Sequence, residues 1–201
     1  MKLKTYLNPV KKFVRIKENK KSRRRKMTNI LLTGYPGIGK TTAIIKLVDQ
    51  IEKKCAGFYT EEIRNARGKR VGFKVKTLSE DREAILAHVD IQSNYRVSKY
   101  GVAIKSFEEV ALPEMSQSDA DFIVIDEIGK MELFSKKFKN KLIECLNQGK
   151  VIATITKRGG GSFVQEIKER KDVELLEITK ANRDTIVEKI VKKAREKRKL
   201  T

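Results

Sequence analysis

The sequence predicts an α/β fold, with a mostly parallel β-sheet, helices on both of its faces and an antiparallel hairpin at one edge. Short apolar runs of strand length alternate with segments of helical periodicity along most of the 201 residues. The strand runs are continuously apolar, which is typical of parallel strands that are buried on both sides. Two neighbouring segments instead alternate polar and apolar residues around a glycine turn, and these predict the hairpin.

The elements of the first half follow from local pattern. NILLT, residues 29–33, has the composition of a buried strand, and KTTAIIKLVDQIEKK, residues 40–54, has helical spacing and a lysine-rich end. GFYTEEIR, residues 57–64, and RVGFKVKTL, residues 70–78, are the two strands of the predicted hairpin. We expect a short helix over 79–89, because SEDREAILAHV begins with a serine N-cap and an acidic first turn.

The second half continues the alternation. Residues 95–105 are expected to be extended, and SFEEVALPEM, residues 106–115, is expected to be helical although Pro113 weakens the pattern. DFIVID, residues 121–126, is a continuous apolar run that ends at acidic residues and predicts a buried strand. The remaining elements, in order, are a helix at 135–149, a strand at 150–156, a helix at 162–170, a strand at 173–179 and a helix at 181–199.

The net charge of +20 is concentrated at the two ends of the chain. Residues 1–26 carry twelve Lys or Arg against one Glu, and residues 189–201 carry seven against one. A block of like charge with few apolar residues favours disorder, so we expect 1–26 to be a disordered basic extension. Residues 27–201 are expected to form one domain that closes with a basic helix. Met27 precedes the first ordered pattern, and the sequence leaves open whether the natural chain begins there.

The other composition signals indicate a soluble, cytoplasmic protein. Cys55 and Cys145 lack metal-ligand spacing and lie in apolar patterns, so we expect buried free thiols in a reducing compartment. No apolar run approaches the ~18 residues that a membrane span requires, and the charged N-terminus is not followed by the apolar region of a secretory signal. His88, the single histidine, falls in a segment expected to be helical and is interpreted as structural.

The segment GYPGIGKTT follows directly on the first predicted strand and leads into the first predicted helix. It matches G-x-x-x-x-G-K-[ST], the P-loop, whose backbone N–H groups surround the phosphates of a nucleotide. Glycines permit the tight backbone and remove side chains that would collide with the phosphates, and the helix N-terminus adds unpaired N–H donors. The candidate nucleotide-binding residues here are Gly34, Tyr35, Pro36, Gly37, Ile38, Gly39, Lys40, Thr41 and Thr42.

Four residues carry specific chemistry in this interpretation. Lys40 can reach the β- and γ-phosphates as a compact cation, and the Thr41 hydroxyl can ligate Mg²⁺. The metal needs an acidic partner, and Asp126 lies at the C-terminal end of a predicted strand, where ligands collect in open parallel sheets. Glu127 lies one residue nearer the phosphates and can orient and deprotonate an attacking water. We therefore expect Mg²⁺ at Thr41 and Asp126, with Lys40 and Glu127 as catalytic residues.

Five further residues near strand ends each have two interpretations. Lys130 is either a contact of the γ-phosphate or a surface lysine. Lys157 and Arg158 precede three glycines, and Arg158 is either an arginine finger supplied in cis or part of a plain flexible loop. Asn182 and Arg183 follow the last predicted strand, where a P-loop protein often holds the nucleobase, although Asn182 equally suits a helix cap.

Several segments appear together in the order of a known family. They are GYPGIGKTT, GFYTEEIR with the turn and strand that follow it, FIVIDEIGKMELFS, FVQEIKER and ELLEITKANRD. From about Met27 to Asp184 the chain resembles the nucleoside-triphosphatase family of thermophilic archaea and bacteria, whose human relative is described as cancer-related nucleoside triphosphatase. The P-loop alone would indicate only a superfamily, whereas GFYTEE and DEIGKMEL are far more specific to this group.

The resemblance implies a three-layer P-loop NTPase fold of the RecA-like or additional-strand-glutamate kind. It also implies Mg²⁺-dependent hydrolysis of ATP, GTP, CTP and other nucleoside triphosphates to the diphosphate, with broad base tolerance. Carried over to this chain, the nucleotide sites are Gly34 through Thr41 and the segment Asp126, Glu127, Ile128, Gly129 and Lys130. The basic extension over 1–26 has no counterpart in the family pattern, which leaves open a tether to an anionic partner.

Two other classes of function also use a P-loop to bind phosphates. A nucleoside or nucleotide kinase would transfer the phosphate to an acceptor, and the only lid-like segment for it is KRGGG. A nucleic-acid-stimulated ATPase would use the basic termini as salt-sensitive contacts with phosphates, although these termini also suit plain solvated charge. The oligomeric state is left open by the sequence.

Overall fold

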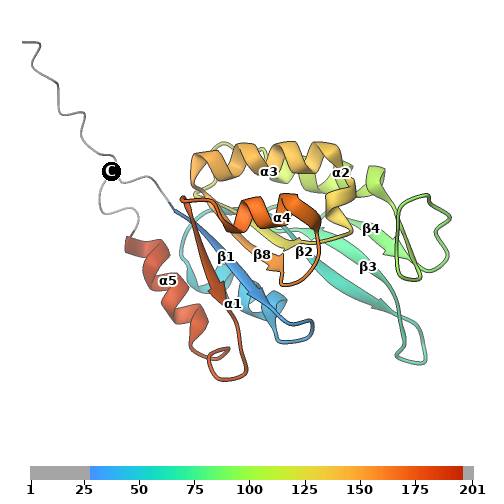
Figure 1. Ribbon diagram of the computed structural model, residues 1–201, viewed down its shortest axis with the longest axis horizontal. Coiled ribbons are helices and arrows are strands. Elements are labelled where there is room, and N and C mark those ends of the chain that lie inside the picture. The colour runs from blue at the N-terminus through green and yellow to red at the C-terminus, as the bar shows by residue number, and fades with distance from the viewer. Residues whose placement is uncertain (1–27, 197–201) are drawn as a thin grey trace, which may run out of the picture.

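The computed structural model describes residues 28–196, and these form one nine-stranded sheet with helices on both faces (Figure 1). The order of the strands is β5-β6-β4-β3-β2-β7-β8-β1-β9. The predicted α/β class is therefore confirmed. The predicted disordered extension over 1–26 lies outside the described residues, and so do the last five residues of the chain.

The elements have the following bounds. The strands are β1 (Asn29–Gly34), β2 (Cys55–Arg64), β3 (Arg70–Thr77), β4 (Glu83–His88), β5 (Arg96–Val97), β6 (Tyr100–Val102), β7 (Phe122–Ile128), β8 (Val151–Thr156) and β9 (Val173–Glu177). The helices are α1 (Lys40–Gln50), α2 (Ile104–Glu114), the 3₁₀ helix η1 (Glu132–Phe134), α3 (Lys136–Gln148), α4 (Gly161–Lys168) and α5 (Ile186–Glu196).

The half of the sheet that contains the P-loop is parallel. β1 pairs in parallel with β8 and β9, β7 pairs with β8, and β2 pairs with β7. The carboxyl ends of these five strands consequently meet at one edge of the sheet, where ligand sites of open α/β folds lie. The predicted buried strands are confirmed, because every residue of β1 and the first five residues of β7 and β8 are buried.

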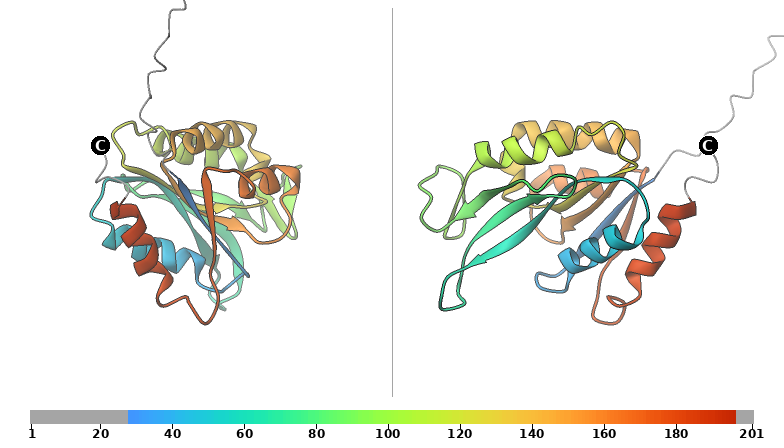
Figure 2. Two further views of the ribbon diagram at one scale, coloured as in Figure 1. Left: turned by 60° about the vertical axis from the view of Figure 1, so that its left-hand side comes forward. Right: turned by 180° about the vertical axis from the view of Figure 1, so that it is seen from behind.

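Two apolar clusters hold the layers together. On one face α2, α3 and α4 cover the sheet, and Phe58, Phe107 and Phe138 meet there edge to face, with ring centroids 5.4–6.0 Å apart. On the other face α1 and α5 pack side by side over β1, through buried residues such as Ile44 and Ile190 (Figure 2). Burying an aliphatic or aromatic side chain contributes about 1.5–3 kcal/mol each, so these two clusters dominate the stability of the fold.

The antiparallel half differs from the sequence prediction. The hairpin of β2 and β3 is present, but β4, β6 and β5 continue the sheet beyond it, so the hairpin does not form the edge. The helix predicted over 79–89 is wrong, because Glu83–His88 is the strand β4. Ser79 does not cap a helix; its hydroxyl bonds the buried carboxylate of Glu114. Long-range pairing of β4 with β3 outweighs the local helical signal.

Smaller differences concern where helices begin. Residues expected to be extended up to 105 already enter α2 at Ile104, and this helix accommodates Pro113 next to its last residue. α3 has the expected ends, with the Ser135 hydroxyl capping it and Gly149 in the left-handed region at φ 71°. α5 begins at Ile186 rather than 181, because the preceding residues form a turn.

Two further expectations concern the cysteines and membranes. Cys145 is buried as expected, whereas Cys55 is only partly buried, and both are free thiols. Burial raises the pKa of each thiol to about 11, so both are protonated at neutral pH and suit apolar packing. None of the helices between residues 28 and 196 has the length and apolar character of a membrane span.

Candidate functional site

The segment from Gly34 to Lys40 turns sharply between β1 and α1, at the carboxyl edge of the parallel strands (Figure 1). Gly34 lies so close to the loop after β9 that a Cβ there would come within 2.7 Å of Cγ2 of Ile178. Gly39 has φ 104°, a conformation that residues with a side chain rarely adopt. These two glycines are therefore required by the local backbone, as the motif predicts.

The N-terminus of α1 is open toward this loop. Among residues 28–196 no side chain caps it, and its first turn contains no acidic residue. Because the first N–H groups of a helix have no partner within the helix, they present hydrogen-bond donors and the positive end of the helix dipole. An anion held by the loop would meet these donors, so the arrangement suits phosphate.

Asp126 and the P-loop are in direct contact. The Thr41 hydroxyl donates a 2.6 Å hydrogen bond to Oδ2 of Asp126, and the Thr154 hydroxyl on β8 donates to Oδ1. Asp126 is 1% exposed. Burial raises the pKa of the Asp126 carboxyl, while the two hydroxyl donors act in the opposite direction. The two predicted metal ligands thus lie together, although Thr41 is on helix α1 and Asp126 is on strand β7.

Glu127 faces the P-loop lysine. Its Oε2 lies 3.4 Å from Nζ of Lys40, and its side chain is 31% exposed. The pairing of β7 with β8 is interrupted between Ile125 and Ile128, which sets Asp126 and Glu127 apart from the regular ladder. The peptide between these two acids is cis. The structure therefore brings the predicted catalytic pair, Lys40 and Glu127, to one place.

Glu132 is a buried acid that the sequence analysis did not single out. Burial, together with the nearby charges of Glu127 and Asp126, raises the pKa of its carboxyl to about 8, although hydrogen bonds from the backbone N–H groups of Glu132 and Gly129 act in the opposite direction. A Cβ at Gly129 would lie 2.9 Å from both the Glu127 and the Glu132 carboxylates. A side chain at position 129 would therefore force these carboxylates to move. The only sequence signal that could have identified Glu132 is its position within the segment DEIGKMEL.

The oxygen donors at the site match the requirements of Mg²⁺. This ion is usually held by one or two carboxylates together with substrate phosphates and water, not by a cage of protein ligands. Thr41 and Asp126 supply a hydroxyl and a carboxylate at hydrogen-bond distance. Over residues 28–196 there is no cluster of three or more His, Cys, Asp or Glu that would hold a metal by itself. The chemistry of the residues present therefore fits a metal that arrives with a nucleotide.

The loop after β8 reaches the P-loop through Tyr35, whose side chain is half exposed. Nζ of Lys157 lies 4.1 Å from the centre of the Tyr35 ring, and Lys157 also pairs with Glu177. Arg158 donates a 3.4 Å hydrogen bond to the Tyr35 hydroxyl. Both cations that precede the three glycines are thus held over the phosphate loop, through a contact that the sequence does not reveal.

Other candidate residues lie elsewhere or have structural roles. Ile128 is fully buried in the core, so any contact with a nucleotide would be through its backbone. Lys130 lines a separate pocket. Asn182 bonds the backbone of Thr179 and Glu177 and thereby shapes the turn before α5, and Arg183 pairs with its neighbour Asp184.

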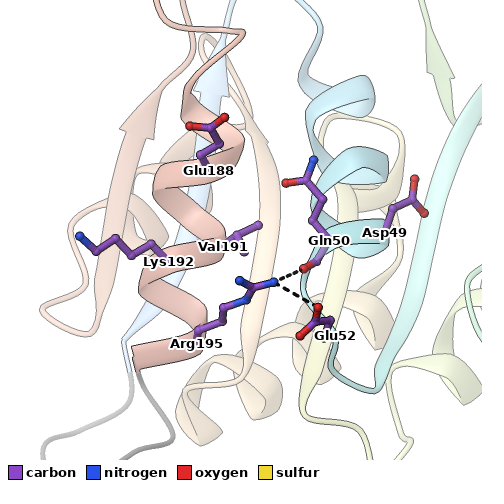
Figure 3. Close-up of a pocket in the computed structure, with 7 residues that line it drawn as sticks. All are labelled: Asp49, Gln50, Glu52, Glu188, Val191, Lys192 and Arg195. Atoms are coloured by element: carbon purple, nitrogen blue, oxygen red, sulfur yellow. Dashed lines mark hydrogen bonds and ion pairs between the residues drawn. The ribbon is translucent and has the colours of Figure 1, made fainter.

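His88, expected in a helix, is the last residue of β4, where Nδ1 accepts from the Asp90 N–H. A large hollow lies between α1 and α5, with a volume of about 590 Å³ (Figure 3). Arg195 of α5 donates a hydrogen bond to the backbone carbonyl of Gln50 at the end of α1 and forms an ion pair with Glu52. This hollow is at the C-terminal end of α1, whereas Lys40 begins the helix, so it is no part of the phosphate site.

Known proteins are similar to this chain over nearly the whole of the part that the structure describes. A family model described as NTPase matches residues 29–191. Nucleoside-triphosphatase THEP1 of Thermotoga maritima is 44% identical over 165 residues, which cover 81% of this chain and 92% of that protein. The human cancer-related nucleoside-triphosphatase is 40% identical over 181 residues, covering 81% of this chain and 94% of that protein.

A solved structure shows the same fold. The crystal structure of THEP1 from the hyperthermophile Aquifex aeolicus aligns with a TM-score of 0.72 at 38% sequence identity. The alignment covers 81% of this chain and 96% of that chain. The fold predicted from GYPGIGKTT and its flanking elements is therefore shared with this relative, nearly all of whose chain is aligned.

Proposed function

The chain belongs to this NTPase family, and we propose that it hydrolyses nucleoside 5′-triphosphates to the diphosphate and phosphate in a Mg²⁺-dependent reaction. The names of the relatives support the reaction class. The observation that carries the proposal is the 2.6 Å contact between Thr41 and Asp126. It joins the last motif residue of the P-loop to an acid near the C-terminal end of β7, which is the arrangement that a nucleotide-bound metal requires.

Thr41 and Asp126 are the residues that would hold Mg²⁺. When bound, the ion would neutralise charge on the β- and γ-phosphates. Thr154 keeps the Asp126 carboxylate in one orientation, because its hydroxyl occupies Oδ1 while Thr41 meets Oδ2. The burial of Asp126 excludes water from this side of the site and strengthens its electrostatic interactions.

Lys40 and Glu127 have different roles in the proposed reaction: Lys40 binds phosphates and Glu127 activates water. In the absence of nucleotide they neutralise each other at 3.4 Å. A bound triphosphate offers Lys40 more negative charge than one carboxylate does, so Lys40 turns to the β- and γ-phosphates. Glu127 is then free to accept a hydrogen bond from a water molecule and to take its proton during attack on the γ-phosphorus. The N–H donors of α1 hold the phosphates in line.

We further propose broad tolerance for the base. The P-loop and the open N-terminus of α1 recognise phosphates, which every nucleoside triphosphate shares. ATP, GTP and CTP are therefore all expected to be substrates.

The first experiment compares phosphate release from Mg²⁺-ATP by the wild type, by Glu127→Gln and by Lys40→Ala, without an acceptor or nucleic acid. Saturable release is expected from the wild type. Glu127→Gln should still bind ATP but should lose about 10²–10⁴-fold in kcat, which is the usual contribution of a general base. Lys40→Ala should abolish turnover. Unchanged hydrolysis by Glu127→Gln would refute the assignment of the base.

A further inference from the structure

The loop between β8 and α4 contacts the P-loop and carries Lys157 and Arg158 in front of three glycines. Gly159, Gly160 and Gly161 all have φ between 70° and 89°, a region of the backbone that glycine adopts without strain. Because glycine restricts the chain least, a run of three does little to determine where the loop lies. The position of the loop therefore depends on the contacts that its two cations make.

Tyr35 of the P-loop is the partner that both cations share. It is 50% exposed, which leaves its ring accessible to charged groups. Nζ of Lys157 lies 4.1 Å from the centre of this ring, and the guanidinium carbon of Arg158 lies 5.5 Å from it. A cation within about 6 Å of a ring centre is attracted by the negative face of the ring. The ring of Tyr35 thus connects the phosphate loop to the loop after β8.

Lys157 is held by more contacts than Arg158. The ammonium group of Lys157 pairs with Glu177 on β9 as well as meeting the ring. The backbone carbonyl of Lys157 accepts a 3.2 Å hydrogen bond from Nζ of Lys168 on α4. Arg158 is exposed, and its side chain contacts Tyr35 through the ring and through a 3.4 Å hydrogen bond to the hydroxyl. Lys157 therefore anchors the loop, whereas Arg158 can leave Tyr35 for a more negative group.

We propose that Tyr35 and Lys157 form a clasp that holds this loop against the P-loop and thereby positions Arg158 for the γ-phosphate. Tyr35 is then a positioning residue, and it acts through its ring and not its hydroxyl, because the ring is what contacts the anchor Lys157. A bound triphosphate draws Arg158 away from Tyr35 by its larger negative charge, while Lys157 and the ring keep the loop in place. The proposal rests on the hydrolysis proposed above and adds how its arginine is positioned.

Two substitutions of Tyr35 separate the ring from the rest of the side chain. Tyr35→Phe keeps the ring and removes the hydroxyl, whereas Tyr35→Leu keeps an apolar side chain and removes the ring. The first measurement uses trypsin on the full-length proteins without nucleotide. Trypsin cleaves after Lys or Arg, so cleavage between Arg158 and Gly159 reports how often the loop opens. The bond between Arg67 and Gly68, in the exposed turn of the β2–β3 hairpin, joins the same two residue types and is the control.

Cleavage between Arg158 and Gly159 should be about tenfold faster in Tyr35→Leu than in the wild type, because loss of two cation–ring contacts raises the open population by about that factor. Tyr35→Phe should match the wild type at this bond. All three proteins should be cleaved equally fast between Arg67 and Gly68, as quantified by mass spectrometry. Equal cleavage after Arg158 in Tyr35→Leu and the wild type, or equal acceleration at both bonds, would overturn the clasp, whether or not the protein hydrolyses ATP.

Steady-state kinetics then test the link to Arg158. Phosphate release from Mg²⁺-ATP is measured for Tyr35→Leu, for Lys157→Met, for their combination, and for Tyr35→Leu in an Arg158→Ala background. Each single clasp variant should lower kcat about tenfold, in proportion to the open population. The KM for ATP should stay within about twofold, because the backbone N–H groups of the P-loop bind the phosphates. Tyr35→Phe should restore the kcat that Tyr35→Leu loses.

The combinations distinguish positioning from a general structural effect. The variant with both Tyr35→Leu and Lys157→Met should be no slower than either alone, because both changes open the same clasp. Tyr35→Leu should have no further effect once Arg158 is replaced. Losses in kcat that multiply to about a hundredfold, or a loss that persists in the Arg158→Ala background, would overturn the positioning role. Absence of ATP hydrolysis by the wild type would refute the proposed function alone, since cleavage by trypsin still decides the clasp.

Discussion

The hydroxyl of Thr41 donates a 2.6 Å hydrogen bond to Oδ2 of Asp126, although 85 positions of sequence separate the two residues. The contact exists because β1 and β7 both end at the same edge of the sheet, with β8 between them. β8 contributes a third member, Thr154, which bonds the other oxygen of the same carboxylate. The start of α1, which follows β1, and the strand β8 thus both contact one buried acid on β7, and several predictions of the proposed chemistry depend on these contacts.

Removing the Thr41 hydroxyl should weaken the dependence of turnover on Mg²⁺. Thr41→Ala deletes one of the two oxygen donors proposed for the ion, whereas Thr41→Ser keeps it. We expect the Mg²⁺ concentration for half-maximal phosphate release to rise at least tenfold in Thr41→Ala, which corresponds to about 1.4 kcal/mol or more of lost binding. Thr41→Ser should stay close to the wild type. A titration with Mg²⁺ at saturating ATP checks this, and identical midpoints for the two variants would contradict the ligand assignment.

Thr154→Val should destabilise the fold. The substitution keeps the shape of the side chain but removes the donor to a buried carboxylate, which leaves one oxygen of Asp126 without its partner. Hydrogen bonds to charged groups contribute about 1.5–3 kcal/mol, and the free energy of unfolding should fall by about that amount in urea titrations at pH 7. Thr156→Val on the same strand is the control, because the Thr156 hydroxyl bonds the backbone of Arg158 at an exposed position. Equal stability of both variants would show that the Thr154 contact is energetically silent.

Glu132 should impose a pH dependence on stability. Its folded-state pKa of about 8 lies above the ordinary value of 4.5, so the folded protein holds a proton here that the unfolded chain has released between these two pH values. The stabilising contribution is therefore complete below about pH 4.5 and is lost as pH rises through 8. Relative to Glu132→Gln, the wild type should lose about 1.4 kcal/mol of unfolding free energy per pH unit between pH 5 and 7. Parallel curves for the two proteins would contradict it.

Arg158 should act on the transferred phosphate. Its present partner is the Tyr35 hydroxyl of the P-loop at 3.4 Å, a weak contact that a bound triphosphate can replace. Arg158→Ala should lower kcat at least a hundredfold with little change in KM for ATP, since arginine fingers stabilise charge in the transition state. Tyr35→Phe removes only the hydroxyl and should leave kcat within about twofold. A decrease in kcat of twofold or less in Arg158→Ala would mean that Arg158 is a solvated charge and does not act as an arginine finger.

Much of the fold could be predicted from local sequence because its signals are local. NILLT and DFIVID are continuous apolar runs, and such runs in alternation with helical patterns are typical of a parallel sheet covered on both faces. The P-loop was predictable for the same reason, since its glycines, lysine and threonine are consecutive. The misassigned segment 79–89 shows the limit of local signals. Its serine and acids have the pattern of a helix start, but pairing with β3 and the bond from Ser79 to Glu114 decide its structure.

The features of the candidate site also differ in whether they depend on local sequence or on long-range packing. The sequence by itself determined the class of fold and the position of Asp126 and Glu127 near the end of a strand, and it predicts the phosphate loop, because each depends on neighbours in the chain. Only the tertiary structure decided that Thr154 holds Asp126, that Arg158 lies over Tyr35 and that Lys130 lines a second pocket. These relationships depend on which strands lie side by side, and strand order is set by the packing of the whole domain.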